Sequence, residues 1–342
     1  MNMRDQFSVR ENTDIESLKL LRPEWDALWQ RCPNATPFQR PEWLLPWVEV
    51  FQPPEIWALE VRRDKQLVGL APLFINHWAP EPVVSTLGAY TSDYLDWLIE
   101  PGSPSRIVQS ILDYMHADAL AADGLELSNV PRGSHLLRSE FLSRWEFEVT
   151  PDEACPVLRL PKTTEDLKTI VQNGQFRNLQ KARRRAERVG QVQVEVATHH
   201  TLDELLEGLM RLHQARWTQV RMPGVLANDA AQEFHYRAAR GLLDRGVLRL
   251  YGLRLGGVLI GVMYTLAERN VLYCYLQGFD PDYAEFSPGV QMIGAVVEDG
   301  VREAKQAVDF LRGREPYKYA WGAQDEPSFR LWAREDMCRS VS

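Results

Sequence analysis

The residues best suited to chemistry lie near the end of the chain, in the segment QAVDFLRGREPYKYAWGAQ at 306–324. Its apolar, strand-like run carries an acid, Asp309, at the centre. A buried, unpaired carboxylate is costly, so Asp309 requires a partner. In one interpretation the partner is Arg312, Arg314 or Lys318, and the ion pair is structural. In the other, the carboxylate takes a proton from a substrate, directly or through water.

The residues that follow this acid add groups for anchoring and proton transfer. Arg312 and Lys318 could bind a phosphate or a carboxylate, and Tyr317 could donate a proton. Gly313 permits a sharp turn beside a ligand, and Glu315 is expected to face the same site. The alternative for Tyr317 is ordinary packing at the rim.

A basic helix is predicted in QFRNLQKARRRAERVG at 175–190, with Gly190 as its C-cap. Four cations share one helical face. They are Arg177, Lys181, Arg184 and Arg188. The face is either a solvated surface or a binding surface for a nucleotide phosphate or an acidic acceptor.

A third feature is the end of the helix TLDELLEGLMRLHQARW, which Thr201 and Glu204 begin as a capping box. His213 continues the apolar stripe of this helix and is expected in the core. Arg216 and Trp217 end the helix and could face an acceptor substrate.

The second half of the chain predicts an α/β unit in which a crossover helix precedes a parallel strand. Gly256-Gly257 marks a tight hairpin turn between its first two strands. In order, the elements are helices at 201–217 and about 230–244, strands VLRLYGLRL, VLIGVMYTLA and VLYCYLQGF, a helix from 288 to about 305, and strand AVDFL.

The first half repeats this order, which indicates an internal duplication; chance similarity is the alternative. Its elements are helices at 15–31 and 40–50, strands IWALEVRR, QLVGLAPLFI and YLDWLIE, a helix at about 104–121, and strand LELSNV. The proline-rich stretch TPDEACPVLRLPK marks the seam. We therefore predict two domains, at 1–155 and 156–342.

Composition excludes several classes of protein. The net charge of −8 argues against a protein that binds nucleic acid over most of its surface. No apolar run is long enough to span a membrane. The start of the chain lacks the apolar core of a signal peptide, and the cysteines form no CxxC pair, so we expect a cytoplasmic protein without a metal site. The motifs GxSxG, HExxH, GxGxxG and the Walker A loop are absent.

Four stretches resemble the CelD-like acetyltransferase family, which is related to the FemAB aminoacyltransferases. They are PFQRPEWLLPWVEVF, LHQARW, YLQGFDPDYAEFSPGVQMI and, most specifically, VDFLRGREPYKYAW. The resemblance spans nearly the whole chain. It implies two tandem GNAT-like units, each a mixed, mostly antiparallel sheet flanked by helices, with a degenerate N-terminal unit and a catalytic C-terminal one.

The resemblance also implies an acyl-CoA donor, acetyl-CoA above all, that enters between VLYCYLQGF and AVDFL. Its phosphates are expected at the start of the crossover helix, where free N–H groups bind anions. The typical glycine-rich loop is replaced there by YAEFSPGVQM, which has one glycine. The cofactor-binding residues are then Ser287, Gly289, Gln291, Arg312 and Gly313.

We expect direct acyl transfer to an amine or hydroxyl, with Asp309 as base, Tyr317 as proton donor to the thiolate, and Lys318 as an anchor. The acceptor would be a small molecule or a polysaccharide precursor. Its binding residues are expected to be Arg177, Arg184, Arg188, Arg216, Trp217 and Glu315. Two alternatives remain: transfer from an aminoacyl-tRNA, with the basic helix on RNA, and a non-catalytic module that binds carbohydrate or peptide.

Overall fold

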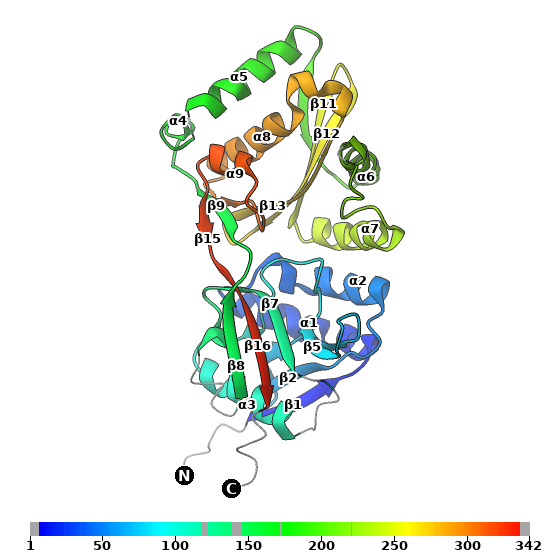
Figure 1. The fold of residues 1–342 in the computed structure, drawn as a ribbon, viewed down its shortest axis with the longest axis vertical. Helices are drawn as coiled ribbons and strands as arrows, with labels where there is room; N and C mark the ends of the chain where they lie inside the picture. The colour runs from blue at the N-terminus through cyan, green and yellow to red at the C-terminus, as the bar shows by residue number, and fades with distance from the viewer. Residues whose placement is uncertain are drawn as a thin grey trace. The chain divides into compact units, whose positions relative to one another are not determined.

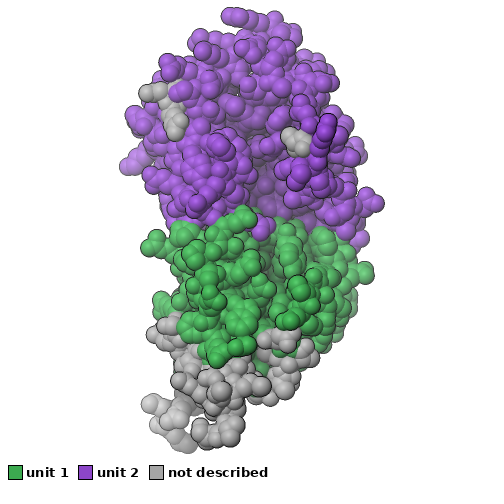
Figure 2. Space-filling view, viewed as in Figure 1, with its two compact units in different colours: residues 1–153, 327–342 green, residues 154–326 purple. Residues whose placement is uncertain are grey.

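The computed structural model describes residues 7–117, 122, 124–138, 145–171, 173–219 and 221–335. The chain divides into two compact units, coloured separately in Figure 2. Unit 1 comprises residues 1–153 and 327–342, and unit 2 comprises residues 154–326. The chain therefore passes from one unit to the other twice.

Unit 1 contains two sheets and their covering helices (Figure 1). One sheet has the order β1-β2-β3-β6 and the other the order β4-β5-β7-β16-β8. The strands are β1 (Phe7–Asn12), β2 (Ala58–Arg63), β3 (Gln66–Ala71), β4 (Leu73–Asn76), β5 (Val83–Thr86), β6 (Leu98–Ile99), β7 (Leu125–Pro131), β8 (Trp145–Pro151) and β16 (Ser328–Glu335). The helices are α1 (Ile15–Arg31), η1 (Pro37–Gln39), α2 (Pro41–Phe51), α3 (Pro104–Ala117) and η2 (His135–Leu137).

Unit 2 is built on a single sheet of order β10-β11-β12-β13-β14-β9-β15. Its strands are β9 (Cys155–Arg159), β10 (Val192–Val196), β11 (Leu248–Leu255), β12 (Val258–Glu268), β13 (Val271–Phe279), β14 (Ala307–Asp309) and β15 (Gln324–Glu326). Its helices are α4 (Leu167–Ile170), α5 (Asn173–Glu187), α6 (Leu202–Gln219), α7 (Asp229–Asp244), η4 (Pro281–Phe286), α8 (Pro288–Arg302) and α9 (Pro316–Ala320).

The two units share an order of strands. In unit 1 the run β4-β5-β7-β16-β8 contains one parallel pair, β5 with β7. In unit 2 the run β12-β13-β14-β9-β15 contains one parallel pair at the same place, β13 with β14. Helices α3 and α8 are the crossovers that these parallel pairs need. The predicted α/β class with mixed, mostly antiparallel sheets is confirmed.

The end of the chain departs from the predicted domain limits, which assigned it to the second unit. Strand β16 lies between β7 and β8 of unit 1, antiparallel to both (Figure 1). Leu331 and Ala333 point into the core of unit 1, whereas Arg330 and Arg334 pair with exposed acids. In unit 2 the equivalent place, between β14 and β15, is taken by β9.

The strand predicted from YLDWLIE is also shorter in the structure, where only Leu98–Ile99 pairs as β6. The backbone before it turns, with Tyr94 at a positive φ of 50°, and Asp96 caps the N–H of Trp97. Strand β5 at Val83–Thr86 takes the place beside β7 instead, and the sequence analysis missed it.

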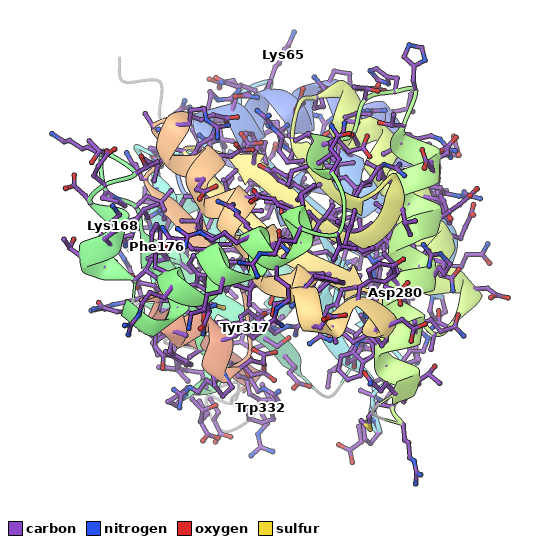
Figure 3. All side chains as sticks on the ribbon, turned by 90° about the horizontal axis from the view of Figure 1, so that it is seen from above. Lys65, Lys168, Phe176, Asp280, Tyr317 and Trp332 are labelled. Carbon is purple, nitrogen blue, oxygen red and sulfur yellow. The ribbon has the colours of Figure 1, made fainter. Side chains whose placement is uncertain are left out.

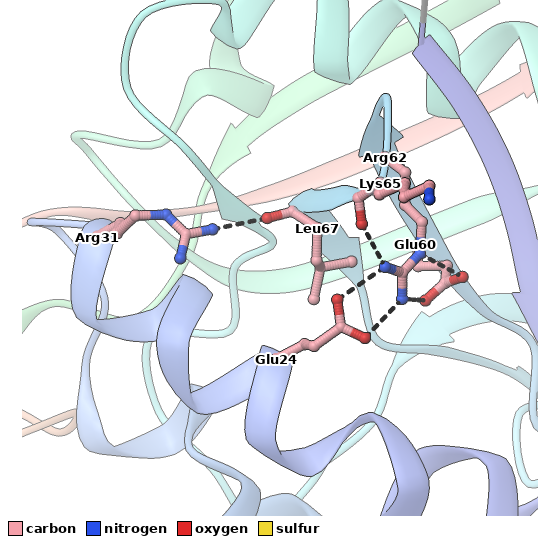
Figure 4. A network of polar contacts seen from close by, with 6 residues as sticks. All are labelled: Glu24, Arg31, Glu60, Arg62, Lys65 and Leu67. Atoms are coloured by element: carbon pink, nitrogen blue, oxygen red, sulfur yellow. Dashed lines mark hydrogen bonds and ion pairs between the residues drawn. The ribbon is translucent and has the colours of Figure 1, made fainter.

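A polar network joins α1 to the hairpin of β2 and β3 (Figure 4). The Arg62 guanidinium donates to Glu24 at 2.7 and 3.0 Å and to Glu60 at 3.1 Å. Arg31, at the end of α1, donates to the Leu67 carbonyl at 2.6 Å. Glu60 is buried, so Arg62 supplies the opposite charge that its carboxylate requires. These bonds fix α1 against the first sheet of unit 1.

Candidate functional site

The candidate site begins where β13 and β14 separate in unit 2. The two strands pair in parallel only from Val271 with Ala307 to Tyr273 with Asp309. Strand β13 then continues to Phe279 without β14, after a register shift against β12 at Cys274 and Leu276. Asp309 is therefore the last paired residue of β14, beside the unpaired half of β13.

Asp309 is buried at 5% exposure, and its Oδ1 accepts the Leu311 N–H at 2.8 Å. This bond holds a turn in which Leu311 has a positive φ of 57°. Burial, and then the Asp309 charge, raises the pKa of the Cys274 thiol to about 12. Cys274 is therefore a neutral thiol at pH 7. The catalytic role of Asp309 stays a prediction.

The ammonium group of Lys318 is bonded within its own turn, whereas the sequence analysis expected it to anchor a ligand. It is buried at 2% exposure, and its Nζ donates to the carbonyls of Leu311, Arg312 and Gly313 at 3.1, 2.8 and 3.0 Å. Glu315 Oε2 lies 2.9 Å from the same nitrogen. Lys318 thus fixes the turn that presents the half-buried Arg312, and Gly313 supplies a φ of 102°. The predicted anchoring roles of these residues stay predictions.

Tyr317, labelled in Figure 3, stands on α9 with its ring edge-on to Phe310. Gln277 Nε2 donates to the phenol oxygen at 3.5 Å. Burial raises the pKa of Tyr317 above its ordinary value, and the charge of Glu315 adds to this effect. The phenol is therefore protonated at neutral pH, as a proton donor must be.

The start of α8 meets the same end of β13. Ser287 turns the chain with a φ of 50°, and Pro288 begins the helix. A Cβ on Gly289 would lie 3.7 Å from Phe279 Cδ1 and 3.8 Å from Gln277 Oε1, in ordinary contact. The helix start, the end of β13 and Tyr317 therefore converge on Gln277. The sequence analysis missed Gln277, although a lone amide in an apolar strand was a usable signal.

Gln291 has a local partner: its Nε2 donates to the Phe286 carbonyl at 2.8 Å and so joins α8 to η4. The side chain is buried, which agrees with this structural contact. Its predicted contact with the cofactor, like that of Ser287, stays a prediction.

The end of α6 reaches the same region of unit 2. The Arg216 guanidinium lies 5.1 Å from the centre of the Phe279 ring and 5.9 Å from that of Trp217. His213, 3% exposed, lies in the core as predicted, with its ring 5.9 Å from Trp217. Arg216 is thus a neighbour of Phe279, the residue beside the start of α8, and the acceptor-binding role expected for Arg216 and Trp217 stays a prediction.

Two buried histidines lie behind this end of β13. Burial, and then Arg216, lowers the pKa of His213 to about 4. Burial, and then His213, lowers the pKa of His235 on α7 to about 3. The His235 ring packs 5.6 Å from Tyr264 and 5.5 Å from Tyr275. Both imidazoles are therefore neutral at pH 7.

These two histidines predict that the protein loses stability in acid. The unfolded chain gains protons below about pH 6.5, whereas the folded one resists protonation down to about pH 4 at His213. As the pH falls through that window, each histidine should lower the free energy of unfolding by roughly 1.4 kcal/mol per pH unit. Urea unfolding at several pH values between 7 and 5 measures the slope. His213→Gln should reduce it, and the exposed His200→Gln should not; equal slopes in all three proteins would refute the argument.

The basic helix α5 packs on the crossover helix and on the turn before it. Arg183 forms a bidentate pair with Glu298 of α8 at 2.8 and 2.7 Å. Arg185 donates to the Glu285 carbonyl at 2.6 Å, two residues before Ser287. Near the start of α5, Lys168 lies 6.0 Å from the centre of the Phe176 ring (Figure 3). Of the predicted face, Arg177, Lys181 and Arg184 are exposed on α5, and Arg188 is exposed one residue past its end.

Comparisons with known proteins agree with this geometry. Residues 173–319 match the family model of the acetyltransferase (GNAT) domain, which thus covers α5 to α9. No curated protein sequence matches the chain significantly.

Several solved structures share the fold at low sequence identity. FemX is 12% identical with a TM-score of 0.67, over 91% of this chain and 95% of FemX. A conserved protein of unknown function from Bacteroides thetaiotaomicron is 11% identical with a TM-score of 0.59, over 92% and 97% of the two chains. L-PGS from Bacillus licheniformis is 12% identical with a TM-score of 0.54, over 80% and 82%. The predicted class of two tandem GNAT-like units is confirmed.

Within the described residues, no helix is long and apolar enough to cross a membrane. The same part of the chain contains no group of three or more histidine, cysteine or acidic side chains suited to a metal ion.

Proposed function

We propose that unit 2 is an acyltransferase that moves an acyl group from acyl-CoA to an amine or hydroxyl by direct transfer. The observation that carries this proposal is the convergence of Asp309, Tyr317 and the start of α8 on the unpaired half of β13. The match to the GNAT acetyltransferase domain over the same residues supports it. The CelD-like resemblance, a cytoplasmic location and a small-molecule or polysaccharide-precursor acceptor are parts of the same proposal.

The residues at the start of α8 fit an acyl-CoA donor. Gly289 leaves space beside Phe279, and the start of a helix attracts anions such as a pyrophosphate. Gln277 Oε1 is buried and has no hydrogen-bond partner among the described residues. An amide N–H of a thioester donor would satisfy it. Ser287, Arg312 and Gly313 lie on the turns that flank this place.

The donor supplies an activated acyl carbon, and the side chains of this chain move protons. Asp309 takes the proton of the acceptor amine, directly or through water, as a bond forms between nitrogen and the acyl carbon. The bond from that carbon to sulfur breaks, and Tyr317 donates its proton to the leaving thiolate. Lys318 keeps the turn of Arg312 and Gly313 in place through their carbonyls.

Binding of the donor tests this proposal most directly. Acetyl-CoA, longer acyl-CoAs and free CoA should each raise the thermal midpoint if they bind the folded protein. Gly289→Leu should weaken acetyl-CoA binding by about tenfold or more, which corresponds to about 1.4 kcal/mol. Gly174→Leu is the matched control, because a Cβ there meets no described atom within 4 Å. Unchanged affinity in Gly289→Leu, or no binding of any CoA species, would contradict the proposal.

A second candidate is transfer from an aminoacyl-tRNA donor, as in the FemAB-type enzymes that the sequence resembles. The likeness of the fold to FemX over most of both chains favours it. The exposed arginines of α5 would then contact RNA backbone, and binding of tRNA would weaken steeply with salt. Replacing Arg177, Arg184 and Arg188 with glutamine should weaken that binding and reduce its salt dependence. A protein that binds neither donor would instead support the non-catalytic carbohydrate- or peptide-binding alternative.

A further inference from the structure

Unit 1 contains a cavity of about 230 Å³ that the proposed transferase does not use. It lies among the end of α1, the segment from Asp96 to Pro104, and the turn at η2. Its walls are mostly apolar, with contributions from Pro33, Ala35, Trp97, Leu98, Ile99, Pro101 and Pro104. Its volume is below the roughly 300–1,000 Å³ of pockets that hold drug-sized ligands. A small, largely apolar molecule is therefore the ligand that fits.

One carboxyl group lines this apolar cavity. Asp96 Oδ1 accepts the Ser134 hydroxyl and the Trp97 N–H, each at 2.8 Å. Its other oxygen has no hydrogen bond or ion pair with any of the described residues. Burial raises the pKa of Asp96 to about 7. A carboxylate held in apolar surroundings without an opposite charge is costly, so a cationic ligand would stabilise it.

The remaining titratable groups at the cavity do not supply that cation. His135 lines it, and its Nδ1 is buried without a partner in the described part of the chain. Burial, and then the charge of Arg138, lowers the pKa of His135, so the imidazole is neutral at pH 7. Cys32, a buried thiol that forms no disulfide with a described residue, also lines the cavity. Arg138, exposed just past η2, is the positive charge that acts on His135.

We propose that this cavity is a binding site for a small alkylamine, whose ammonium group pairs with Asp96 and whose apolar body packs against Trp97 and Ile99. The site lies entirely within unit 1 and is separate from the proposed transferase residues of unit 2. Asp96 comes from the polar stretch YTSDYLDW, which contributes nothing to the proposed chemistry. The N-terminal unit thus has a recognition function of its own.

Cyclohexylamine and cyclohexanol are suitable probes, because they share one apolar body and differ in charge. Calorimetry on the unmodified protein should show that the amine binds at pH 8 and that its affinity falls about tenfold at pH 6. The affinity falls because Asp96 is mostly ionised at pH 8 and mostly protonated at pH 6. The alkylamine, with a pKa near 10, is charged at both pH values. Cyclohexanol should bind more weakly at pH 8 and without this pH dependence.

Asp96→Asn should abolish the preference for the amine. Asp113→Asn is the matched control, because it removes the same charge from an exposed position on α3 of the same unit. Equal binding of amine and alcohol at pH 8, no binding of either, or an unchanged preference in Asp96→Asn would overturn the proposal. The first two outcomes use the unmodified protein, so the test decides even if Asp96→Asn fails to fold.

Discussion

Replacing Asp309 with asparagine should lower turnover of the proposed acyl transfer by about two to four orders of magnitude, the usual loss when a general base is removed. The fold should remain, because an asparagine Oδ1 can still accept the Leu311 N–H that Asp309 accepts at 2.8 Å. Single-turnover rates with a saturating donor, beside urea unfolding of the same variant, separate the two effects.

The competing interpretation of Asp309 is a buried charge that only stabilises its turn. In that case Asp309→Asn should lower the free energy of unfolding by about 3–5 kcal/mol and turn over normally when folded. Asp325→Asn is the matched control: this exposed acid accepts the Tyr319 hydroxyl at 2.7 Å and pairs with Arg314 at 3.1 Å. Its stability should change by no more than about 1 kcal/mol, as for other exposed pairs. If Asp309→Asn unfolds easily but keeps normal turnover when folded, Asp309 has a structural role and is not the general base.

Replacing Tyr317 with phenylalanine should also reduce turnover by about two to four orders of magnitude, because the leaving thiolate would lose its proposed proton donor. The cost in stability should be small, since the phenol oxygen receives only the long 3.5 Å bond from Gln277. Burial raises the pKa of this phenol, so the parent should keep its acid form to higher pH than a free tyrosine. The pH profile of turnover in the parent should therefore show no alkaline limb from this phenol at the pH of about 10 where a free tyrosine ionises.

Tyr319→Phe is the control for this experiment, because Tyr319 lies two residues away on α9 and bonds to Asp325. It should retain turnover. Normal activity in Tyr317→Phe would leave that residue with the packing role that the sequence analysis kept as its alternative.

The local parts of the fold were predictable from the sequence because short-range signals define them. The helix expected at 15–31 is α1 at Ile15–Arg31, and the first hairpin of unit 2 turns at the glycines expected from the sequence, Gly256 and Gly257. Strand β16 was misassigned, since its partners in β7 and β8 lie nearly two hundred residues earlier. No local pattern encodes such a distant pairing.

The candidate site shows the same limit at the level of side chains. Charge and composition singled out Asp309, Tyr317 and Lys318, but three partners of Lys318 are backbone carbonyls, which no sequence pattern reveals. Gln277 was missed as a functional candidate: its place in an apolar strand was visible in the sequence, but the burial of its Oε1 and the missing partner of that atom were not. Those properties exist only after the chain has folded.

The placement of β9 and β16 also sets the order in which the sheets can be completed during synthesis. Every strand of unit 2 is synthesised before β16, because that unit occupies the continuous stretch 154–326. Strands β7 and β8 are made early, yet they must wait for β16 to fill the place between them. The sheet that begins with β4 is therefore started before any strand of unit 2 is made, yet it is the last of the described sheets to receive all its strands.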